Sequence, residues 1–447
     1  MSVALNSQDT FARGVHPGDQ KQFAADKAIE VLPTPAEVRI ALLQHLGAPC
    51  EAAVKPRAEV ELGQMVGEAK AFACAPVHAS VAGKTARVTT STLPNGRHVM
   101  VVPITAAEEQ PLGGQELFDD VFGGDWPTEG LDSYEPGQIA EAAKTAGLVG
   151  LGGAAFPTHV KLTANPDKPI SHLLVNGCEC EPYLTADYRL MLEAPAPIIT
   201  GAMLAGRATG ADEVIICVED NKPEAIAALK KAAEGTGVEV RQLHTKYPQG
   251  GEKQLISAVL DKEVPNGGLP LDVGVVVVNV GTAASLARAT IRNKPLTHRV
   301  ITVTGAGIKE PKNLLAPVGA SYRDLIDFCG GLTDDANRVI SGGPMMGFTL
   351  GSLDSPVTKG TSGITVLTEE EVARTKETSC VRCGRCAEVC PMNLVPTKLA
   401  LASRWRHTDI LSSYHIGACM ECGCCAYTCP ARLPLVQLIR LGKILVR

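Results

Sequence analysis

The sequence predicts a multidomain protein of mixed α/β and α+β structure, and three observations support this prediction. With 447 residues the chain is too long to bury a single hydrophobic core, so we expect about three or four domains. In the middle of the chain, apolar strand-length runs alternate with helical stretches, which is typical of a doubly wound parallel sheet. Near the C-terminal end, one cysteine pattern occurs twice.

Composition excludes several classes of function. Hydrophobic residues make up 45% and charged residues 20%, as in ordinary soluble globular proteins. A balance of 42 basic against 48 acidic residues, with only 4% aromatics, argues against a nucleic-acid partner. The first ten residues are polar, so we expect no secretory signal. The longest strongly apolar run, 273–280, is far shorter than the roughly 20 residues of a membrane span, so we expect no transmembrane segment.

The doubled cysteine pattern is the strongest chemical signal. The first run reads Cys380-x2-Cys383-x2-Cys386-x3-Cys390-Pro391, and the same spacing recurs from Cys419 to Pro430. Zinc knots, the alternative, use C-x2-C pairs rather than three evenly stepped cysteines. The spacing resembles that of bacterial two-cluster ferredoxins, in which the fourth cysteine of each run binds the other cluster. The resemblance implies two [4Fe-4S] clusters, one on Cys380, Cys383, Cys386 and Cys429 and the other on Cys419, Cys422, Cys425 and Cys390.

We predict that residues 1–128 form the first domain. Short alternating runs over 54–88 are broken by glycine and proline, which indicates small antiparallel β structure. The pattern resembles the lipoyl-type barrel-sandwich hybrid. Lys70 lies roughly where a lipoyl lysine would, but an exposed lysine is far more often unmodified. The glycine-rich stretch 113–130 reads as a linker.

The second predicted domain, 129–292, contains three turns that could bind a ligand. A glycine-rich stretch at 147–153 precedes Lys161, so backbone N–H groups and a positive charge could meet an anion or a flat ring, although a plain connection explains the glycines equally well. Apolar strands run into Asn176 and Asn279, and polar groups at strand ends are where α/β folds place ligands. A further glycine turn precedes Glu252.

The third and fourth predicted domains are 293–366 and 367–447. Residues 297–331 read as strand, glycine-containing hairpin turn, strand and short helix, and they resemble the soluble-ligand-binding β-grasp module. The segment 394–414 between the cysteine runs is long enough for one or two helices, as in helical ferredoxin domains. The stretch 434–447 predicts a short amphipathic helix. The sequence assigns no role to Met345 and Met346 beyond packing.

The chain as a whole resembles the RnfC family, the peripheral subunit of the Rnf ion-translocating ferredoxin:NAD oxidoreductase. The motifs "GLGGAAFPTHVKL", "NGCECEPYLTADYRL", "KYPQGGEKQL", "NVGTAAS" and both cysteine runs occur together and in order. The central domain is similar to the flavin subunit of respiratory complex I. This resemblance implies that FMN is bound by Gly150, Gly152, Gly153, Lys161, Asn176, Glu179, Cys180, Gly251, Glu252, Asn279 and Thr282.

The resemblance also places Phe156 and Glu181 near a bound nicotinamide nucleotide, NAD(H). Three positions depart from the complex I pattern, because Leu151 replaces an arginine, Cys178 an aspartate and Lys253 a glutamate. These departures leave nucleotide affinity, and the choice between NADH and NADPH, open. Cys178 and Cys180 could be read as metal ligands, but no second pair lies nearby, so a structural role is favoured.

The implied function is electron entry. NADH would deliver electrons through FMN to the two clusters, and from there to membrane-embedded and iron–sulfur subunits and indirectly to ferredoxin. The implied location is peripheral, on the cytoplasmic face of the bacterial inner membrane. Two alternatives stay open at this point. One is a PduS-type cobalamin reductase of bacterial microcompartments, and the other is a cluster scaffold that only relays electrons without binding flavin or NADH.

Overall fold

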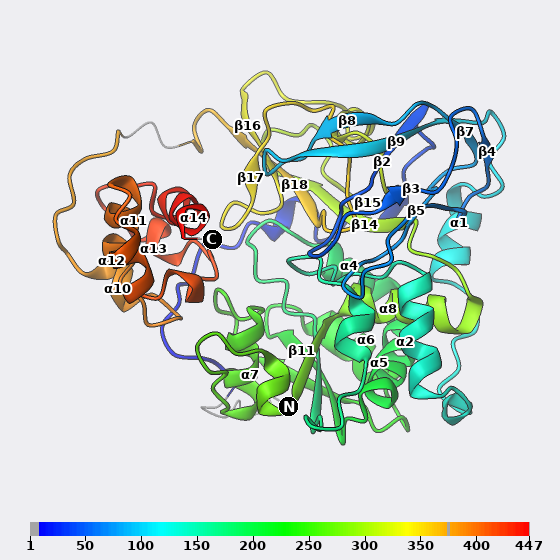
Figure 1. Ribbon diagram of the computed structural model, residues 1–447, viewed down its shortest axis with the longest axis horizontal. Helices are drawn as coiled ribbons and strands as arrows, with labels where there is room; N and C mark the ends of the chain where they lie inside the picture. The colour runs from blue at the N-terminus through cyan, green and yellow to red at the C-terminus, as the bar shows by residue number, and fades with distance from the viewer. Residues whose placement is uncertain (1–8, 373–375, 447) are drawn as a thin grey trace.

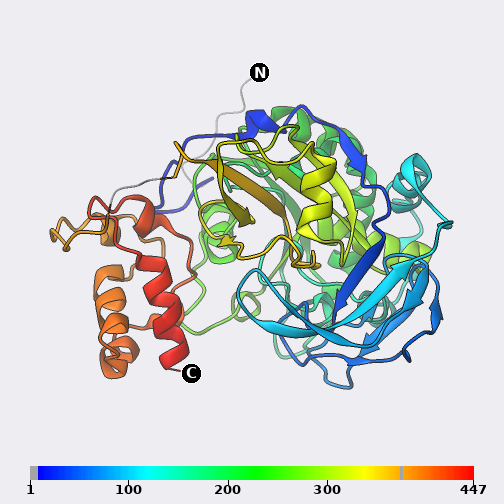
Figure 2. The same cartoon turned by 90° about the horizontal axis from the view of Figure 1, so that it is seen from above.

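The computed structural model describes residues 9–372 and 376–446 of the chain. The C-terminal helices form a lobe beside the β-containing parts, as the red and orange ribbons of Figure 1 show and Figure 2 confirms from above. The N-terminal segment, residues 9–24, contacts this lobe through Gly14 and Arg13, and it contacts the central sheet domain through Val15. We call residues 9–24 the N-terminal strap.

The first β unit is a small sandwich of two antiparallel sheets. Val38, Ile40, Val66, Val77 and Ile104 are fully buried between them. The five-stranded sheet has the order β2-β9-β7-β4 with β8 paired to β9, and the other has the order β3-β5-β6. The strands are β2 (Glu37–Ala41), β3 (Glu51–Ala52), β4 (Glu59–Val60), β5 (Met65–Glu68), β6 (Val77–His78), β7 (Gly83–Thr85), β8 (Thr89–Thr92) and β9 (His98–Ala106).

The central unit is a parallel sheet with helices on both faces, which confirms the predicted doubly wound arrangement. Its order is β12-β11-β10-β13 and every pairing is parallel. Leu255 and Ile256 of α7 pack on one face, and α5 and α8 cover the other. The elements are β10 (His172–Asn176), β11 (Glu213–Glu219), β12 (Glu239–Leu243), β13 (Val275–Asn279), α2 (Pro136–Thr145), α3 (Thr158–Leu162), α4 (Ala186–Glu193), α5 (Pro195–Thr209), α6 (Pro223–Ala232), α7 (Glu252–Leu260) and α8 (Val280–Arg292).

The third unit is a mixed sheet of order β1-β15-β14-β18-β16-β17. The predicted hairpin at 305–307 is confirmed, because β14 and β15 are antiparallel neighbours. Strand β1 comes from the part of the chain assigned to the first domain, and it pairs with β15. The elements are β1 (Ile29–Val31), β14 (His298–Thr304), β15 (Lys312–Pro317), α9 (Tyr322–Phe328), β16 (Ala336–Ser341), β17 (Phe348–Thr349) and β18 (Gly363–Thr368).

The C-terminal lobe repeats one helical unit twice. In each cysteine run a left-handed glycine, Gly384 or Gly423, precedes a one-turn helix, and a longer helix follows. The helices predicted at 394–414 and after 434 are both present. They are α10 (Arg385–Glu388), α11 (Pro396–Arg404), α12 (Thr408–Ser413), α13 (Cys424–Tyr427) and α14 (Leu435–Leu445).

The prediction of a plain linker at 113–130 was wrong. Helix α1 (Gly114–Val121) forms there and buries Leu117 and Val121. These apolar residues are four positions apart, so they lie on one face of a helix, and the glycines at both ends concealed that pattern.

Within the two described ranges, no helix has both the length and the apolar character needed to cross a bilayer.

Candidate functional site

The carboxyl ends of the parallel strands meet at one edge of the sheet, where the side chains predicted to bind ligands gather. Asn176 ends β10 in register with Asn279 at the end of β13. The Oδ1 atom of Asn279 accepts hydrogen bonds from the backbone N–H groups of Gly281 at 2.8 Å and Thr282 at 3.4 Å, and so caps α8. Ligands of α/β proteins bind outside this edge.

The glycine loop, residues 150–153, folds onto the start of α8. The backbone N–H of Leu151 donates to Oγ1 of Thr282 at 3.0 Å, and that of Gly150 donates to the carbonyl of Phe156 at 2.8 Å. A Cβ atom at position 152 would lie 2.8 Å from Nδ2 of Asn279, so a side chain does not fit there. Gly153 faces open space. The loop therefore offers bare backbone at the sheet edge.

A lysine joins this loop region to the third predicted turn. Nζ of Lys161, on α3, lies 2.6 Å from Oε1 of Glu252 and donates to the carbonyl of Val277 at 3.0 Å. Glu252 is the first residue of α7, directly after Gly251. The side-chain Nδ2 of Asn176 donates to the carbonyl of Gly250 at 2.8 Å. These bonds bring the turn at 250–252 against both β10 and α3.

Residues 178–184, which we call the acidic turn, follow β10. Glu179 has a left-handed backbone (φ 45°), and its carboxylate accepts the N–H groups of Asp187 at 2.7 Å and Tyr188 at 3.0 Å at the start of α4. Asp187 in turn accepts a hydrogen bond from Nδ2 of Asn279 at 2.7 Å. Burial, followed by the neighbouring Glu179 charge, raises the pKa of Asp187 to about 7. The acidic turn is thereby fixed to the end of β13.

Glu181 connects the acidic turn to residues 341–350, the Met loop. Its carboxylate accepts the backbone N–H groups of Met345 at 3.1 Å and Met346 at 2.8 Å. Burial raises the pKa of Glu181 to about 7, although the two N–H groups favour the charged form. The backbone of the Met loop therefore has a definite role that the sequence did not reveal.

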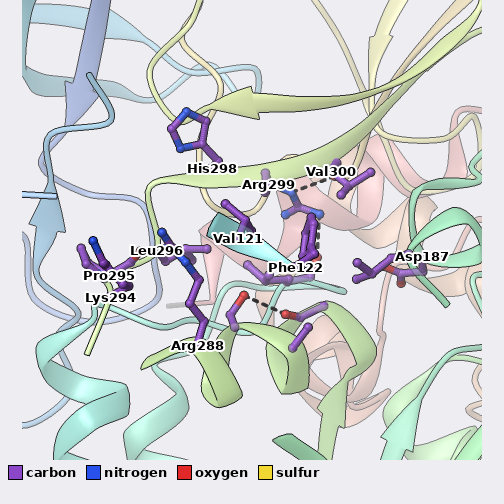
Figure 3. A pocket seen from close by; sticks show the side chains of 15 residues that line it. Val121, Phe122, Asp187, Arg288, Lys294, Pro295, Leu296, His298, Arg299 and Val300 are labelled. Atoms are coloured by element: carbon purple, nitrogen blue, oxygen red, sulfur yellow. Dashed lines mark hydrogen bonds between the residues drawn. The ribbon is translucent and has the colours of Figure 1, made fainter. Parts of the chain in front are cut away.

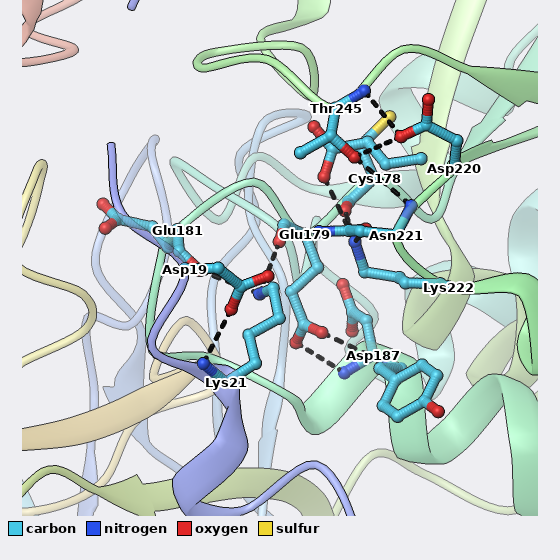
Figure 4. Close-up of polar contacts among 12 residues, drawn as sticks. Asp19, Lys21, Cys178, Glu179, Glu181, Asp187, Asp220, Asn221, Lys222 and Thr245 are labelled. Atoms are coloured by element: carbon cyan, nitrogen blue, oxygen red, sulfur yellow. Dashed lines mark hydrogen bonds and ion pairs between the residues drawn. The ribbon is translucent and has the colours of Figure 1, made fainter. Parts of the chain in front are cut away.

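Two buried ammonium groups lie against the acidic turn, and Figure 4 shows the polar contacts around them. Nζ of Lys222 donates to the carbonyl of Cys178 at 2.6 Å and lies 3.1 Å from the carboxylate of Glu219. The second ammonium belongs to Lys21 of the N-terminal strap. Sequence reasoning missed both lysines, because neither belongs to a recognisable motif.

A pocket lies behind the glycine loop (Figure 3). It shares Leu151, Asp187 and Gly281 with the sheet edge, but most of its lining comes from 121–122 and 284–300. The guanidinium of Arg299 donates to the carbonyl of Leu151 at 3.3 Å, so this wall of the pocket supports the loop from behind.

In the C-terminal lobe, five cysteines line one cavity. Cys390 of the first run and Cys419, Cys422 and Cys425 of the second are the set expected for one cluster, and the fifth is Cys424. Backbone N–H groups of Leu394 and Glu421 donate to the sulfur atoms of Cys390 and Cys419, each at 3.4 Å. Such bonds to sulfur tune cluster potentials. This donor set therefore fits an iron–sulfur cluster.

The other four cysteines form the matching half of the repeat. Cys386 and Cys429 are buried, Cys380 is half-buried and Cys383 is exposed. The N–H of Arg382 donates to the sulfur of Cys380 at 3.4 Å, as that of Glu421 does in the second run. Within the described ranges, no three His, Cys, Asp or Glu side chains converge as they would around a single metal ion.

The cavity of the second cysteine run lies directly against the sheet edge. The Tyr247 hydroxyl donates to the carbonyl of Cys422 at 2.7 Å, and Tyr247 packs with Cys422, Cys424 and Val15. Cys180 of the acidic turn and Met345 pack against the same group. One continuous buried contact therefore joins the acidic turn to this cysteine run.

Comparison with known proteins places the chain in a family. Its segments match, in order, the RnfC barrel sandwich hybrid domain (9–109), the Nuo51 FMN-binding domain (143–288), the SLBB domain (300–349) and a 4Fe-4S dicluster domain (379–433). It is 44% identical to a subunit of the proton-translocating ferredoxin:NAD(+) oxidoreductase complex of Clostridium ljungdahlii, over 88% of this chain and 84% of the relative. The chain belongs to the RnfC family.

Other members are also similar. A subunit of the Na(+)-translocating ferredoxin:NAD(+) oxidoreductase complex of Acetobacterium woodii is 44% identical over 88% of this chain and 86% of its own length. A subunit of the ion-translocating oxidoreductase complex of Rhodobacter capsulatus is 38% identical over 86% of this chain and 73% of its own length. Among solved structures, a chain of an NAD+-reducing [NiFe]-hydrogenase in the H2-reduced state aligns with a TM-score of 0.51 at 20% identity, covering 72% of this chain and 65% of that one. That likeness concerns the fold alone.

These matches confirm the predicted domain types, including an FMN-binding domain and a 4Fe-4S dicluster domain in this RnfC-family chain. The thirteen residues expected to bind FMN or NAD(H) lie in the segment from the glycine loop to α3, at the ends of β10 and β13, in the acidic turn, and at the starts of α7 and α8. Their contact with either cofactor stays a prediction.

The raised pKa of Glu181 predicts a pH-dependent stability difference. Between pH 4.5 and 7 the folded protein keeps a proton that the unfolded chain releases, so this carboxyl group destabilises the fold as pH rises. The substitution Glu181→Gln removes this pH-dependent contribution to stability, because glutamine does not titrate. We expect the stability of wild type relative to Glu181→Gln to fall by up to about 3 kcal/mol between pH 5 and 8. Urea unfolding of both proteins over this pH range measures the difference in their free energies of unfolding. Asp187 is present in both proteins, so its titration does not contribute to the difference. A difference that is constant with pH would contradict the raised pKa of Glu181.

Proposed function

We propose that this chain is the electron-entry subunit of an ion-translocating ferredoxin:NAD oxidoreductase complex. Membership of the RnfC family supports this function, and so do the FMN-binding and dicluster domains. The observation that carries the proposal is the buried contact from the acidic turn through Tyr247 to Cys422. Electron transfer needs cofactors held close together, and this contact brings the two candidate cofactor sites side by side.

The residues at the sheet edge would each hold part of the cofactors. FMN, when bound, supplies the conversion between two-electron hydride chemistry and one-electron transfer. Lys161 and the glycine loop suit its phosphate, because they combine a positive charge with bare backbone. Asn176, Asn279 and the acidic turn would orient the flavin ring. Phe156 and Glu181 would lie beside the nicotinamide.

No side chain in this arrangement need act as an acid, base or nucleophile. The carboxylates of Glu179 and Glu181 are already engaged with backbone N–H groups, which fixes their positions. We assign them to orienting the cofactors and tuning their electrostatic surroundings.

The two clusters would act in sequence. A cluster held by Cys390, Cys419, Cys422 and Cys425 would lie near Tyr247 and the acidic turn, because Cys422 packs against Tyr247, and it would exchange electrons with the flavin. Cys380, Cys383, Cys386 and Cys429 would hold the other cluster; Cys383 is exposed, so this cluster would exchange electrons with the next protein. Those partners would be membrane-embedded and iron–sulfur subunits, with ferredoxin reached indirectly. The location would be peripheral, on the cytoplasmic face of the inner membrane.

An anaerobic titration with NADH tests the entry function. The protein loaded with FMN and both clusters should lose its flavin absorbance at about one NADH per flavin, and slower cluster reduction should follow. Flavin that stays oxidised would leave only the cluster-relay alternative. If the flavin is reduced, transfer of electrons to an added corrinoid instead of the Rnf subunits would favour the cobalamin reductase alternative.

Lys161→Met should weaken FMN binding about tenfold, because one charge-assisted contact to the phosphate is lost. The exposed Lys168 forms an ion pair of similar length with Asp272, so Lys168→Met is the matched control and should leave FMN affinity unchanged. Quenching of flavin fluorescence measures both. Equal affinities for the two variants would remove Lys161 from the site.

The cluster order predicts opposite results for two cysteine variants. In Cys422→Ala the flavin should still be reduced by NADH, but the cluster that includes Cys380 should no longer receive electrons quickly. In Cys383→Ala the cluster near Tyr247 should still be reduced. Electron paramagnetic resonance of samples frozen after NADH addition distinguishes the clusters. If the cluster that includes Cys380 is reduced at the wild-type rate in Cys422→Ala, the proposed order of the clusters is wrong.

A further inference from the structure

Lys21 is a buried lysine that holds the acidic turn from the N-terminal strap. Only 8% of its surface is exposed. Its Nζ donates to the carbonyl oxygens of Glu179 at 3.0 Å, Glu181 at 2.9 Å and Leu184 at 2.5 Å. An ammonium group has three donors, and all three are used on this one turn. The turn therefore closes around the lysine.

The carbonyl oxygens of Glu179 and Glu181 accept hydrogen bonds from Lys21, which orients the peptide group that follows each of these two residues. Glu179 is held in a left-handed conformation that costs a non-glycine residue energy, so an external partner is needed to maintain it. The side chains of the same two residues are free to point elsewhere, to α4 and to the Met loop. Lys21 thus fixes the backbone from which both carboxylates project.

Lys21 also contributes charge to a buried group of four. Burial and the Lys222 charge lower the pKa of Lys21, whereas the carboxylates of Glu179 and Glu219 favour the charged forms of both lysines. Lys222 is only 1% exposed and Glu219 1%. Replacing Lys21 by a neutral residue would leave this group with a net negative charge next to the sheet edge.

The strap that carries Lys21 continues to the cluster lobe. Val15 and Tyr247 exchange two backbone hydrogen bonds of 2.9 Å. The N–H of Gly14 donates to the carbonyl of Val389, one residue before Cys390, at 3.1 Å. Arg13 donates to the carbonyl of Ala387 at 2.8 Å. One short segment therefore touches the acidic turn, Tyr247 and the first cysteine run.

We propose that Lys21 is a positioning residue for electron entry, which holds the acidic turn in its binding geometry and supplies a positive charge that raises the flavin potential. This inference rests on the proposed function. The reduced flavin carries additional negative charge, so a nearby cation favours it and a net negative group disfavours it. The held turn presents Glu181 to the nicotinamide.

Two substitutions separate geometry from charge. Lys21→Gln keeps two N–H donors but is neutral. Lys21→Arg keeps the positive charge but places it on a larger, planar guanidinium group. Lys27→Gln is the control, because Lys27 is half exposed and pairs only loosely with Asp26, at 3.4 Å. The flavin midpoint potential is measured by titration with a chemical reductant. The KM for NADH is measured with ferricyanide as acceptor, and thermal unfolding checks folding.

We expect Lys21→Gln to have a lower flavin potential than wild type, and Lys21→Arg to keep the wild-type potential. Both should raise the KM for NADH about tenfold, because the turn is no longer held by three matched bonds. Lys27→Gln should match wild type in both measurements. Wild-type potential and KM in Lys21→Gln would overturn the inference, and if that variant does not fold, a wild-type KM in Lys21→Arg would do so.

Failure of the proposed function has a separate signature. If wild-type protein binds FMN but NADH does not reduce the flavin, this result alone refutes the electron-entry function, and no variant is needed to show it. The potentials, which need no NADH, would still decide whether Lys21 acts on the flavin. Wild-type protein that binds no FMN would refute both proposals.

Discussion

The site depends on the hydrogen bonds that the side-chain amide of Asn279 makes. Its oxygen caps α8, its nitrogen donates to Asp187 at the start of α4, and Gly152 packs against it. Because Asn279 ends β13 in register with Asn176, these contacts fix the glycine loop and the acidic turn relative to the sheet. An asparagine is suited to this role, since one planar group both accepts and donates. A residue without both functions would leave buried groups unpaired.

The second constraint is the placement of the cluster lobe. The lobe is held at the sheet edge by hydrogen bonds from distant parts of the chain. Tyr247 contacts Cys422, the N-terminal strap contacts residues 387–389, and Arg440 donates to the carbonyl of Met346 at 2.9 Å. Glu181 binds the other side of that loop. The Met loop is thus clamped between the acidic turn and the lobe, and the distance between the two candidate cofactor sites is set by short, direct contacts.

Much of this arrangement could be predicted from the sequence, and the reasons are local. Apolar runs ending in Asn176 and Asn279 reveal buried parallel strands, and the cysteine spacing reveals the cluster lobe. Lys21 could not be found this way, because its partners lie about 160 positions further along the chain and no periodic pattern links them. The same holds for the Met loop, whose contribution is made by backbone N–H groups rather than by its methionine side chains. Helix α1 was missed because flanking glycines suggested a linker.

The central claim is that FMN binds at the carboxyl edge of β10 and β13, next to the cluster on Cys390, Cys419, Cys422 and Cys425. A structure of the cluster-loaded protein with FMN and NADH bound tests it most directly. We expect flavin density between the glycine loop and the acidic turn, in contact with Asn176 or Asn279 and on the side facing Tyr247. Flavin bound elsewhere, for example in the pocket lined by Arg288 and Arg299, would contradict the claim.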